Sequence, residues 1–257
     1  LNVDVKKINC TPNGIFTHNP EPLKENLTEL CDVVKKNKSN FGIAVDPDVD
    51  RLVFVDERGE MFGEEYTLVA CSDYVLSKSP GSIVSNLSSS RALPDLAKQY
   101  GVNHFTSAVG EFHVVEKMKA VKAVIGGEGN GGVIYPKLHY GRDALVGIAL
   151  FLSLLAEKKL SISALKNKYT NYVMRKTKIN LNNDIKVDLI LKKIAKKFEN
   201  FNISESDGVK VDFEDSWIHL RKSNTEPIIR LYAEGKEMDH VDEIIKEFKE
   251  LIKSYSS

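Results

Sequence analysis

The sequence predicts an α/β protein built of layered domains with mixed sheets, followed by a smaller α+β domain. Two observations indicate this architecture. Strand and helix patterns alternate along most of the 257 residues, and the composition changes after the polar stretch KTKINLNNDIK. Apolar residues make up 42% of the chain, which is enough to supply real cores. We expect three parts, covering residues 1–60, 61–168 and 169–257.

Apolar spacing predicts the individual elements in order along the chain. In the first helix, Leu23, Leu27, Leu30 and Val34 recur at helical spacing. Short apolar runs bounded by turn-forming residues predict the strands. The expected strands cover residues 41–45, 51–56, 82–87, 101–106, 122–127, 216–221 and 227–235. The expected helices cover residues 22–36, 90–100, 111–119, 142–158, 187–201 and 240–254.

Charge and cysteine content argue against several classes of protein. Lys plus Arg and Asp plus Glu both number 36, so the formal charge is zero and a broad nucleic-acid-binding face is not expected. The three cysteines are far apart and form no C-x-x-C pair, which disfavours a disulfide scaffold or a zinc site and favours the cytoplasm. The longest apolar run, ALVGIALFLSLLA, is too short to span a membrane.

Three carboxylates, Asp46, Asp48 and Asp50, stand on alternate residues immediately before Arg51. Pro47 cannot continue a strand ladder, so we expect a tight loop at the end of the preceding strand. The like charges repel one another, and a divalent cation would offset this repulsion. Carboxylate oxygens suit Mg²⁺. A solvated acidic turn is the alternative interpretation.

The same loop partly matches an EF-hand, because Glu57 follows the aspartates at the spacing of the last calcium ligand. Arg51 stands where an EF-hand has glycine, and the flanking patterns are strands rather than helices. A Ca²⁺-binding structural domain is therefore disfavoured, and a titration comparing Mg²⁺ with Ca²⁺ tests it.

A second motif is the glycine-rich stretch GGEGNGGVIYP, residues 126–136. It matches G-x-G-x-x-G after a predicted strand, but it leads into another strand instead of a helix, so we reject a dinucleotide site. Glu128 and Asn130 offer a carboxylate and an amide, which suit paired sugar hydroxyls. A flexible turn is the alternative.

The third motif, RKSNTEPIIR, lies between the last two predicted strands. Hydroxyls, backbone N–H groups and guanidinium groups together make a phosphate-binding nest, although a plain turn is the alternative. The residues concerned are Arg221, Ser223, Asn224, Thr225 and Arg230.

In this order, the three motifs resemble those of the α-D-phosphohexomutases, the phosphoglucomutase/phosphomannomutase superfamily. VDPDVDR resembles the metal loop D-G-D-x-D-R with Pro47 in place of glycine, GGEGNGG resembles a sugar-binding loop G-G-E-x-N-G-G, and RKSNTEP resembles a phosphate-binding loop R-x-S-x-T-E-P. The resemblance extends over nearly the whole chain. It implies mixed-sheet three-layer phosphohexomutase domains, followed by a smaller α+β C-terminal domain.

The resemblance also implies a function and roles for the motif residues. Asp46, Asp48 and Asp50 would hold Mg²⁺, and Arg51 would act catalytically by orienting the phosphoryl group. The glycine loop would bind the sugar hydroxyls, and the last motif would bind the phosphate that is not transferred. The implied reaction moves a phosphoryl group between the 1- and 6-positions of a hexose or hexosamine phosphate through a phosphoserine and a 1,6-bisphosphate.

The loop patterns are most similar to the bacterial and archaeal branch often assigned to phosphoglucosamine mutase, while phosphomannomutase and phosphoglucomutase activity stay open. The family's nucleophilic serine, in a T-A-S-H-N-P-like loop, has no counterpart here. IFTHNPEP lacks a serine at that place, resembles the family's F-x-H-N-P-E-P segment, and is interpreted as structural. We therefore expect a fragment without the phosphoserine domain, inactive alone. A non-catalytic phosphosugar-binding module is the alternative.

Three further residues are candidates for substrate contact. Glu111 and His113 follow a VGE turn that resembles a family segment bordering the substrate, although both also suit an ordinary surface helix. Arg91 follows Ser88 and Ser89 at the start of a predicted helix after a strand, where an anion is favoured.

Overall fold

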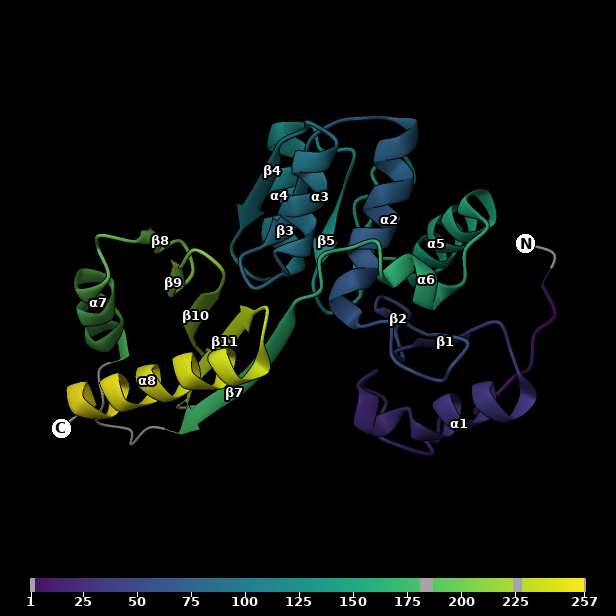
Figure 1. Ribbon diagram of the computed structural model, residues 1–257, viewed down its shortest axis with the longest axis horizontal. Helices are drawn as coiled ribbons and strands as arrows, with labels where there is room; N and C mark the ends of the chain where they lie inside the picture. The colour runs from purple at the N-terminus through teal and green to yellow at the C-terminus, as the bar shows by residue number, and fades with distance from the viewer. Residues whose placement is uncertain (1–2, 181–186, 224–227, 257) are drawn as a thin grey trace. The chain divides into compact units, whose positions relative to one another are not determined.

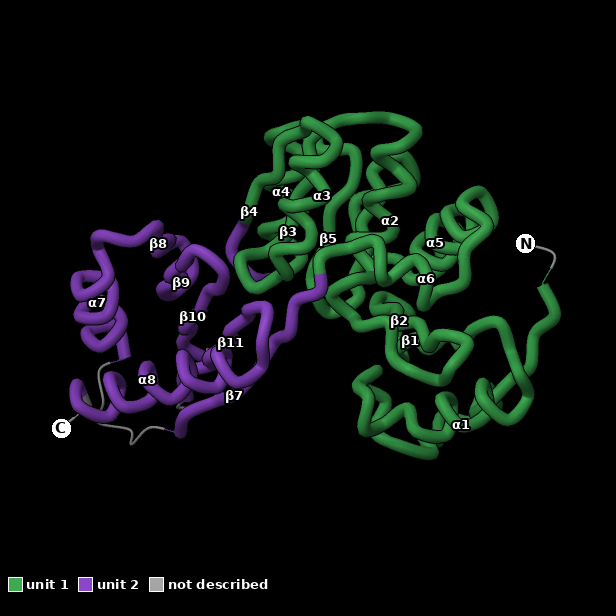
Figure 2. The backbone as a smooth tube through the Cα atoms, viewed as in Figure 1, with its two compact units in different colours: residues 1–106, 110–170 green, residues 107–109, 171–257 purple. Residues whose placement is uncertain are grey.

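The computed structural model describes residues 3–180, 187–223 and 228–256 of the chain. The chain divides into two compact units (Figure 2). The first comprises residues 1–106 and 110–170, and the second comprises residues 107–109 and 171–257. Within the described residues, no helix has the length and apolar character needed to cross a bilayer.

The first unit begins with a helical segment packed on a two-stranded hairpin (Figure 1). Its elements are η1 (Lys24–Asn26), α1 (Thr28–Asn37), β1 (Gly42–Val45) and β2 (Leu52–Val55). The strands pair antiparallel, with Val45 opposite Leu52. Val34 of α1 is buried and lies against Gly42, so the helix covers the hairpin. The turn between the two strands carries the three aspartates.

The centre of the first unit is a mixed four-stranded sheet in the order β4-β3-β5-β6. β3 and β5 pair parallel, and β5 and β6 pair antiparallel. The strands are β3 (Ile83–Asn86), β4 (His104–Ser107), β5 (Ile125–Glu128) and β6 (Gly132–Ile134). The helix α2 (Glu64–Lys78) precedes β3, while α3 (Ala92–Gln99) and α4 (Glu111–Val121) connect β3 to β4 and β4 to β5.

Helices cover both faces of this sheet, as a three-layer fold requires. On β5, Gly126 faces Met118 of α4, while the next residue, Gly127, faces Leu68 of α2. Successive strand residues point to opposite faces, so α4 and α2 lie on opposite sides of β5. Val84, Val114 and Met118 form part of the buried cluster under α4.

Two further helices, α5 (Ala144–Lys158) and α6 (Ile162–Lys166), complete the first unit. Phe151 of α5 stacks on Phe54 of β2 with ring centroids 3.7 Å apart, and the edge of Phe62 meets Phe151 at 5.1 Å. α5 is therefore anchored to the hairpin that carries the acidic turn.

The second unit is an antiparallel five-stranded sheet, β7-β11-β10-β9-β8, with two helices on one face. Its elements are β7 (Val173–Asn180), α7 (Val187–Lys197), β8 (Asn202–Ser204), β9 (Val209–Asp212), β10 (Trp217–Lys222), β11 (Ile228–Gly235) and α8 (Met238–Ser256). Ile218 and Leu220 of β10 pack with Phe248 of α8 in the core. His219 and Arg221 alternate with them and therefore belong to the opposite face.

Most of the expected elements are present, with ends shifted by a few residues, and both the mixed sheet and the α+β character of the second unit are confirmed. Five elements were not predicted: α2, α6, β7, β8 and β9. The polar stretch at 176–186 begins within β7, which continues to Asn180.

Candidate functional site

The acidic turn joins β1 to β2 and brings the three aspartates together. Asp46, Asp48 and Asp50 each offer a carboxylate oxygen, and these atoms all lie within 4.8 Å of one another. Asp46 is buried, Asp50 is half-buried and Asp48 is exposed. A hydrogen bond attaches the turn to α5: the N–H of Ala144, at the start of that helix, donates to the Val49 carbonyl at 3.0 Å.

Asp46 is the structural centre of the turn. Its Oδ1 accepts the backbone N–H groups of Asp50 and Arg51 at 3.1 and 2.9 Å, and its Oδ2 accepts Arg51 Nε at 2.6 Å. Burial opposes the charged form, but these donors outweigh it and hold the pKa of Asp46 below its ordinary value. These contacts therefore offset part of the repulsion between the three aspartates within the turn itself.

Arg51 is held from two sides. Besides the contact to Asp46, its Nη1 donates to Glu21 Oε2 at 2.6 Å and its Nη2 to Glu21 Oε1 at 3.4 Å. Glu21 belongs to the HNPEP segment, so the segment interpreted as structural positions the arginine next to the aspartates. Sequence reasoning missed Glu21, because no local pattern links residues this far apart.

Asp50 lies beside the guanidinium groups of both Arg142 and Arg51. Burial raises its pKa to about 6; the Arg142 guanidinium acts in the other direction, and Asp46 and Asp48 add to the rise. Its Oδ2 contacts Arg142 Nη2, whereas its buried Oδ1 has no hydrogen-bond partner among the described residues. Asp50 Oδ1 lies 3.6 Å from Arg51 Nε. A carboxylate oxygen that accepts no hydrogen bond and adjoins two further carboxylates fits a hard cation such as Mg²⁺.

The glycine loop follows β5 and lies against the acidic hairpin. Leu52 N–H donates to the Gly131 carbonyl at 3.1 Å. Gly131 has a φ of +90°, and a Cβ there would lie 2.4 Å from the Leu52 carbonyl oxygen. A side chain at this position would separate the two segments, so Gly131 permits the glycine loop to lie against the acidic hairpin.

Glu128, the last residue of β5, is 4% exposed and accepts three hydrogen bonds. Its Oε1 accepts Asn86 Nδ2 at 2.8 Å and Gly110 N–H at 2.9 Å, and its Oε2 accepts Arg142 Nη1 at 2.9 Å. Asn130, by contrast, turns its Oδ1 back onto the N–H of Gly132 at 3.2 Å, which shapes the loop.

Of the further candidates, Glu111 adjoins this network and His113 is an exposed residue of α4. Glu111 Oε1 accepts the backbone N–H of Arg142 at 2.9 Å, and its Oε2 lies 3.4 Å from Arg142 Nε. Arg91 is half-buried at the start of α3. Arg142, in the GRDA segment, had no predicted role, although it meets Asp50, Glu128 and Glu111 together.

In the second unit, Arg221 on β10 stands directly opposite Arg230 on β11. Like charges on opposing strand positions are unfavourable without an anion between them. Asp207 supplies part of the compensation, with its Oδ2 2.7 Å from Arg221 Nε. That pair is not an aligned hydrogen bond, since Arg221 Nε has no hydrogen-bond acceptor among the described residues.

The loop between these strands is closed at its base, where Ser223 N–H donates to the Ile228 carbonyl at 3.1 Å. Ser223 is buried. Asn224 and Thr225 lie outside the described residues. Paired arginines beside a loop closed in this way form a surface suited to an anion such as phosphate.

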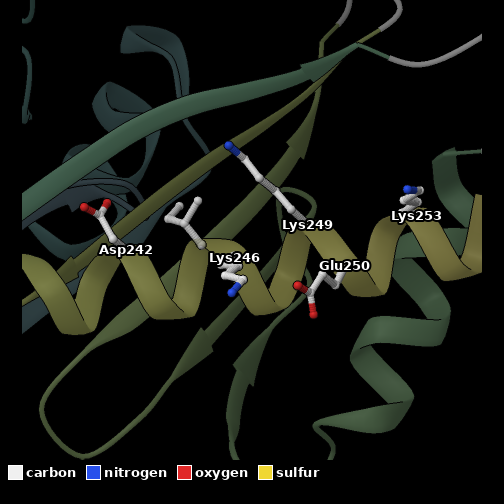
Figure 3. A pocket seen from close by; sticks show the side chains of 6 residues that line it. Asp242, Lys246, Lys249, Glu250 and Lys253 are labelled. Atoms are coloured by element: carbon white, nitrogen blue, oxygen red, sulfur yellow. The ribbon is translucent and has the colours of Figure 1, made fainter.

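A surface hollow elsewhere on the second unit contains none of the predicted site residues. It follows α8, and Asp242, Lys246, Lys249, Glu250 and Lys253 line it together with Ile245 (Figure 3). These side chains all come from a single helix, and the hollow has no part in the site.

Known proteins resemble this chain along nearly its whole length. The sequence matches the phosphoglucomutase/phosphomannomutase α/β/α domain II over residues 1–59, the α/β/α domain III over residues 63–172, and the C-terminal domain over residues 174–251. A phosphoglucomutase/phosphomannomutase from Thermococcus kodakarensis is 35% identical over 250 residues, which cover 96% of this chain and 54% of that protein.

Other relatives carry different substrate names. A phosphoglucosamine/phosphogalactosamine mutase from Sulfurisphaera tokodaii is 32% identical, with 98% of this chain and 57% of that protein covered. A crystal structure of a phosphoglucomutase/phosphomannomutase family protein from Burkholderia thailandensis superimposes with a TM-score of 0.81 at 28% identity, covering 93% of this chain and 52% of the other.

The chain spans about half the length of these curated relatives. Three consecutive domain matches nevertheless account for nearly all of it, and the mixed three-layer fold agrees with them. The chain belongs to the phosphoglucomutase/phosphomannomutase family, the α-D-phosphohexomutases, in the part that corresponds to domains II, III and IV.

Proposed function

We propose that this chain contributes the metal, sugar and phosphate sites of a phosphohexomutase. The reaction is reversible transfer of a phosphoryl group between the 1- and 6-positions of a hexose or hexosamine phosphate, through a phosphoserine and a 1,6-bisphosphate. The observation that carries the proposal is that one guanidinium, Arg142, contacts both Asp50 of the acidic turn and Glu128 of the glycine loop. The proposed cation site and the proposed hydroxyl-reading carboxylate are therefore neighbours within one unit.

Asp46, Asp48 and Asp50 are the proposed Mg²⁺ ligands. When bound, Mg²⁺ supplies positive charge that neutralises phosphoryl oxygens. Asp50 Oδ1 is proposed as a ligand, because it accepts no hydrogen bond among the described residues and its nearest cationic neighbour there is Arg51 Nε at 3.6 Å, whereas Oδ2 is engaged by Arg142. Arg51 is the proposed catalytic arginine: Asp46 and Glu21 hold its position, and a fixed guanidinium orients a phosphoryl group without reorganising during the reaction.

Glu128 and Asn130 are the proposed readers of sugar hydroxyls. Glu128 fits this role because three donors fix its carboxylate. In the second unit, Arg221, Ser223 and Arg230 are proposed to hold the phosphate that is not transferred, with Asn224 and Thr225 of the same motif as expected partners. Glu111, His113 and Arg91 remain candidates for contact with the substrate.

We further propose that the nucleophilic serine comes from a domain outside these 257 residues. The decisive test is a coupled assay on the protein with that domain present, using glucose 1-phosphate, mannose 1-phosphate and glucosamine 1-phosphate in parallel. Formation of the corresponding 6-phosphates, dependent on Mg²⁺ and not supported by Ca²⁺, is the expected result. The ratio of kcat/KM values then ranks the substrates, because the relatives' names differ on this point.

Two results would count against the proposal. Calorimetric binding of all three sugar phosphates without turnover would favour a non-catalytic phosphosugar-binding module. Equal activity in Mg²⁺ and in a chelator would remove the aspartates from the mechanism.

A further inference from the structure

Arg142 occupies a central position that the proposed reaction leaves unexplained. Its backbone is fixed: its N–H donates to Glu111 Oε1 at 2.9 Å, and it forms a β-bridge with Ile134 at the end of β6. The next residue, Asp143, donates its N–H to the Val133 carbonyl at 2.9 Å and caps α5 through its side chain. These contacts hold the backbone of Arg142 in place. Its side chain is 18% exposed and is therefore largely enclosed.

From this position the guanidinium meets three carboxylates. Nη2 contacts Asp50 Oδ2, Nη1 donates to Glu128 Oε2 at 2.9 Å, and Nε lies 3.4 Å from Glu111 Oε2. A guanidinium can bridge in this way because its donors are held in a planar fork, which a lysine ammonium does not offer.

We propose that Arg142 is a positioning residue that couples cation binding at the aspartates to the placement of Glu128. Without a cation, Asp50, Glu128 and Glu111 share the charge of Arg142. When a bound cation neutralises the Asp50 carboxylate, the Arg142 guanidinium is attracted more strongly to Glu128 and fixes the position of that carboxylate. The proposal rests on the proposed function for the sugar-reading role of Glu128, but the coupling itself concerns only Mg²⁺, Arg142 and Glu128.

By linkage, the coupling has a consequence that can be measured without any sugar. If a cation strengthens the attachment of Arg142 to Glu128, then Glu128 must in turn favour cation binding by drawing Arg142 away from Asp50. Glu128 is not one of the proposed metal ligands, so an effect transmitted through Arg142 identifies the link.

The test is calorimetric titration of Mg²⁺ into the metal-free 257-residue chain at slightly alkaline pH and fixed ionic strength. Arg142→Met should bind Mg²⁺ roughly threefold to tenfold tighter than wild type, because the substitution removes the positively charged guanidinium beside Asp50. The Mg²⁺ affinity of Arg142→Lys should stay within about twofold of wild type. This variant keeps the positive charge and loses only the planar set of guanidinium donors.

The link between the two residues is measured by a double-mutant cycle. Glu128→Gln should weaken Mg²⁺ binding roughly threefold to tenfold in the Arg142 background, and less than about twofold when Arg142→Met is also present. Arg58→Met is the matched control. Arg58 likewise pairs with a buried carboxylate, Asp56, at 2.7 Å, but Asp56 follows β2 at the end opposite the acidic turn, so Mg²⁺ affinity should not change.

Three outcomes would overturn the proposal. Unchanged Mg²⁺ affinity in Arg142→Met would show that the guanidinium does not act on the cation site. Equal effects of Glu128→Gln in both backgrounds would show that Glu128 acts on the cation directly. Weaker Mg²⁺ binding together with a lower melting temperature in both Arg142 variants would mean that Arg142 is only structural. None of these depends on hexose phosphate turnover, so failure of the proposed function is distinguished by the separate coupled assay.

Discussion

Glu21 and Arg51 form a two-point ion pair, with Nη1 of the arginine 2.6 Å from Oε2 of the glutamate and Nη2 3.4 Å from Oε1. Arg51 Nε is held at the same time by Asp46 at 2.6 Å. The guanidinium is therefore fixed in plane by carboxylates from two segments of the chain. This explains what the HNPEP segment does without a serine: it positions an arginine beside the acidic turn.

We predict that Glu21→Gln lowers turnover of the active protein by about tenfold, because Arg51, the proposed catalytic arginine, would lose its orientation. The melting temperature should change little, since partly exposed ion pairs contribute only about 0–1 kcal/mol to stability. Steady-state kinetics and thermal unfolding of the same variant check this. Glu29→Gln, an exposed glutamate of α1 that accepts Asn9 Nδ2, is the control and should leave turnover unchanged. Wild-type kcat in Glu21→Gln would show that Asp46 alone positions Arg51.

Asp48→Asn should abolish most Mg²⁺-dependent turnover while leaving the fold intact. Asp48 is the exposed member of the three aspartates, so the packing does not depend on it. The amide keeps a ligand oxygen but loses the charge on which a hard-cation site depends. The measurement is turnover as a function of Mg²⁺ concentration. Full activity at ordinary Mg²⁺ would remove Asp48 from the metal site.

The second unit should lose stability as the pH falls from about 6.5 to about 4, through His219. This residue is 1% exposed, and burial lowers its pKa from 6.5 to about 4. Its Nε2 lies 2.6 Å from the Asp207 carbonyl, which can only accept, so the neutral ring donates from Nε2. Between these two pH values the unfolded state binds a proton that the folded state does not, so stability rises with pH across this window. The loss on acidification is on the order of 3 kcal/mol.

Denaturant unfolding at several pH values measures this effect. Trp217, the single tryptophan of the chain, is fully buried in β10, so its fluorescence reports on the second unit. His219→Gln removes the titrating group and should flatten the pH profile in this window. An unchanged profile in that variant would assign the acid sensitivity to other groups.

The parts of the fold that could be predicted are those in which apolar and polar residues alternate with a clear helical or strand period. The second unit's helices show apolar residues on one face and charged residues on the other, and both were placed correctly. α2 was missed because residues from Tyr66 to Asp73 are all buried, which leaves no polar face to give a period. β7 was missed because its composition, VMRKTKIN, is polar; as an edge strand it needs few buried side chains.

The candidate site divides in the same way. The three motifs could be found because each is local: the three aspartates span five residues, and the glycine and RKSNTEP loops are continuous segments. The residues that join the site could not be found. Arg142 and Asp50 are 92 residues apart, and Arg51 and Glu21 are 30 apart. The packing of α5 on the hairpin, and of Gly131 against Leu52, brings Arg142 to Asp50.

The last prediction concerns Arg221, where two arginines face each other across β10 and β11. Asp207 compensates only part of this charge, so a phosphate bound there gains charge-assisted contacts. Such contacts contribute roughly 1.5–3 kcal/mol each, and about 1.4 kcal/mol corresponds to tenfold in affinity. Arg221→Ala should therefore weaken hexose phosphate binding by roughly tenfold to a hundredfold. The fold should persist, because Arg221 belongs to the face of the sheet away from α7 and α8.

Lys222→Ala is the matched control. Lys222 follows Arg221 directly, alternates to the helix-bearing face, and lies 3.4 Å from Asp188 of α7 in an exposed ion pair. It should leave affinity unchanged, although it removes the same charge one residue away. The measurement is calorimetric titration of glucose 1-phosphate and glucose 6-phosphate into the active protein and both variants at fixed ionic strength. If wild type and Arg221→Ala bind equally well at equal thermal stability, the RKSNTEP loop is only a turn and the paired arginines hold no phosphate.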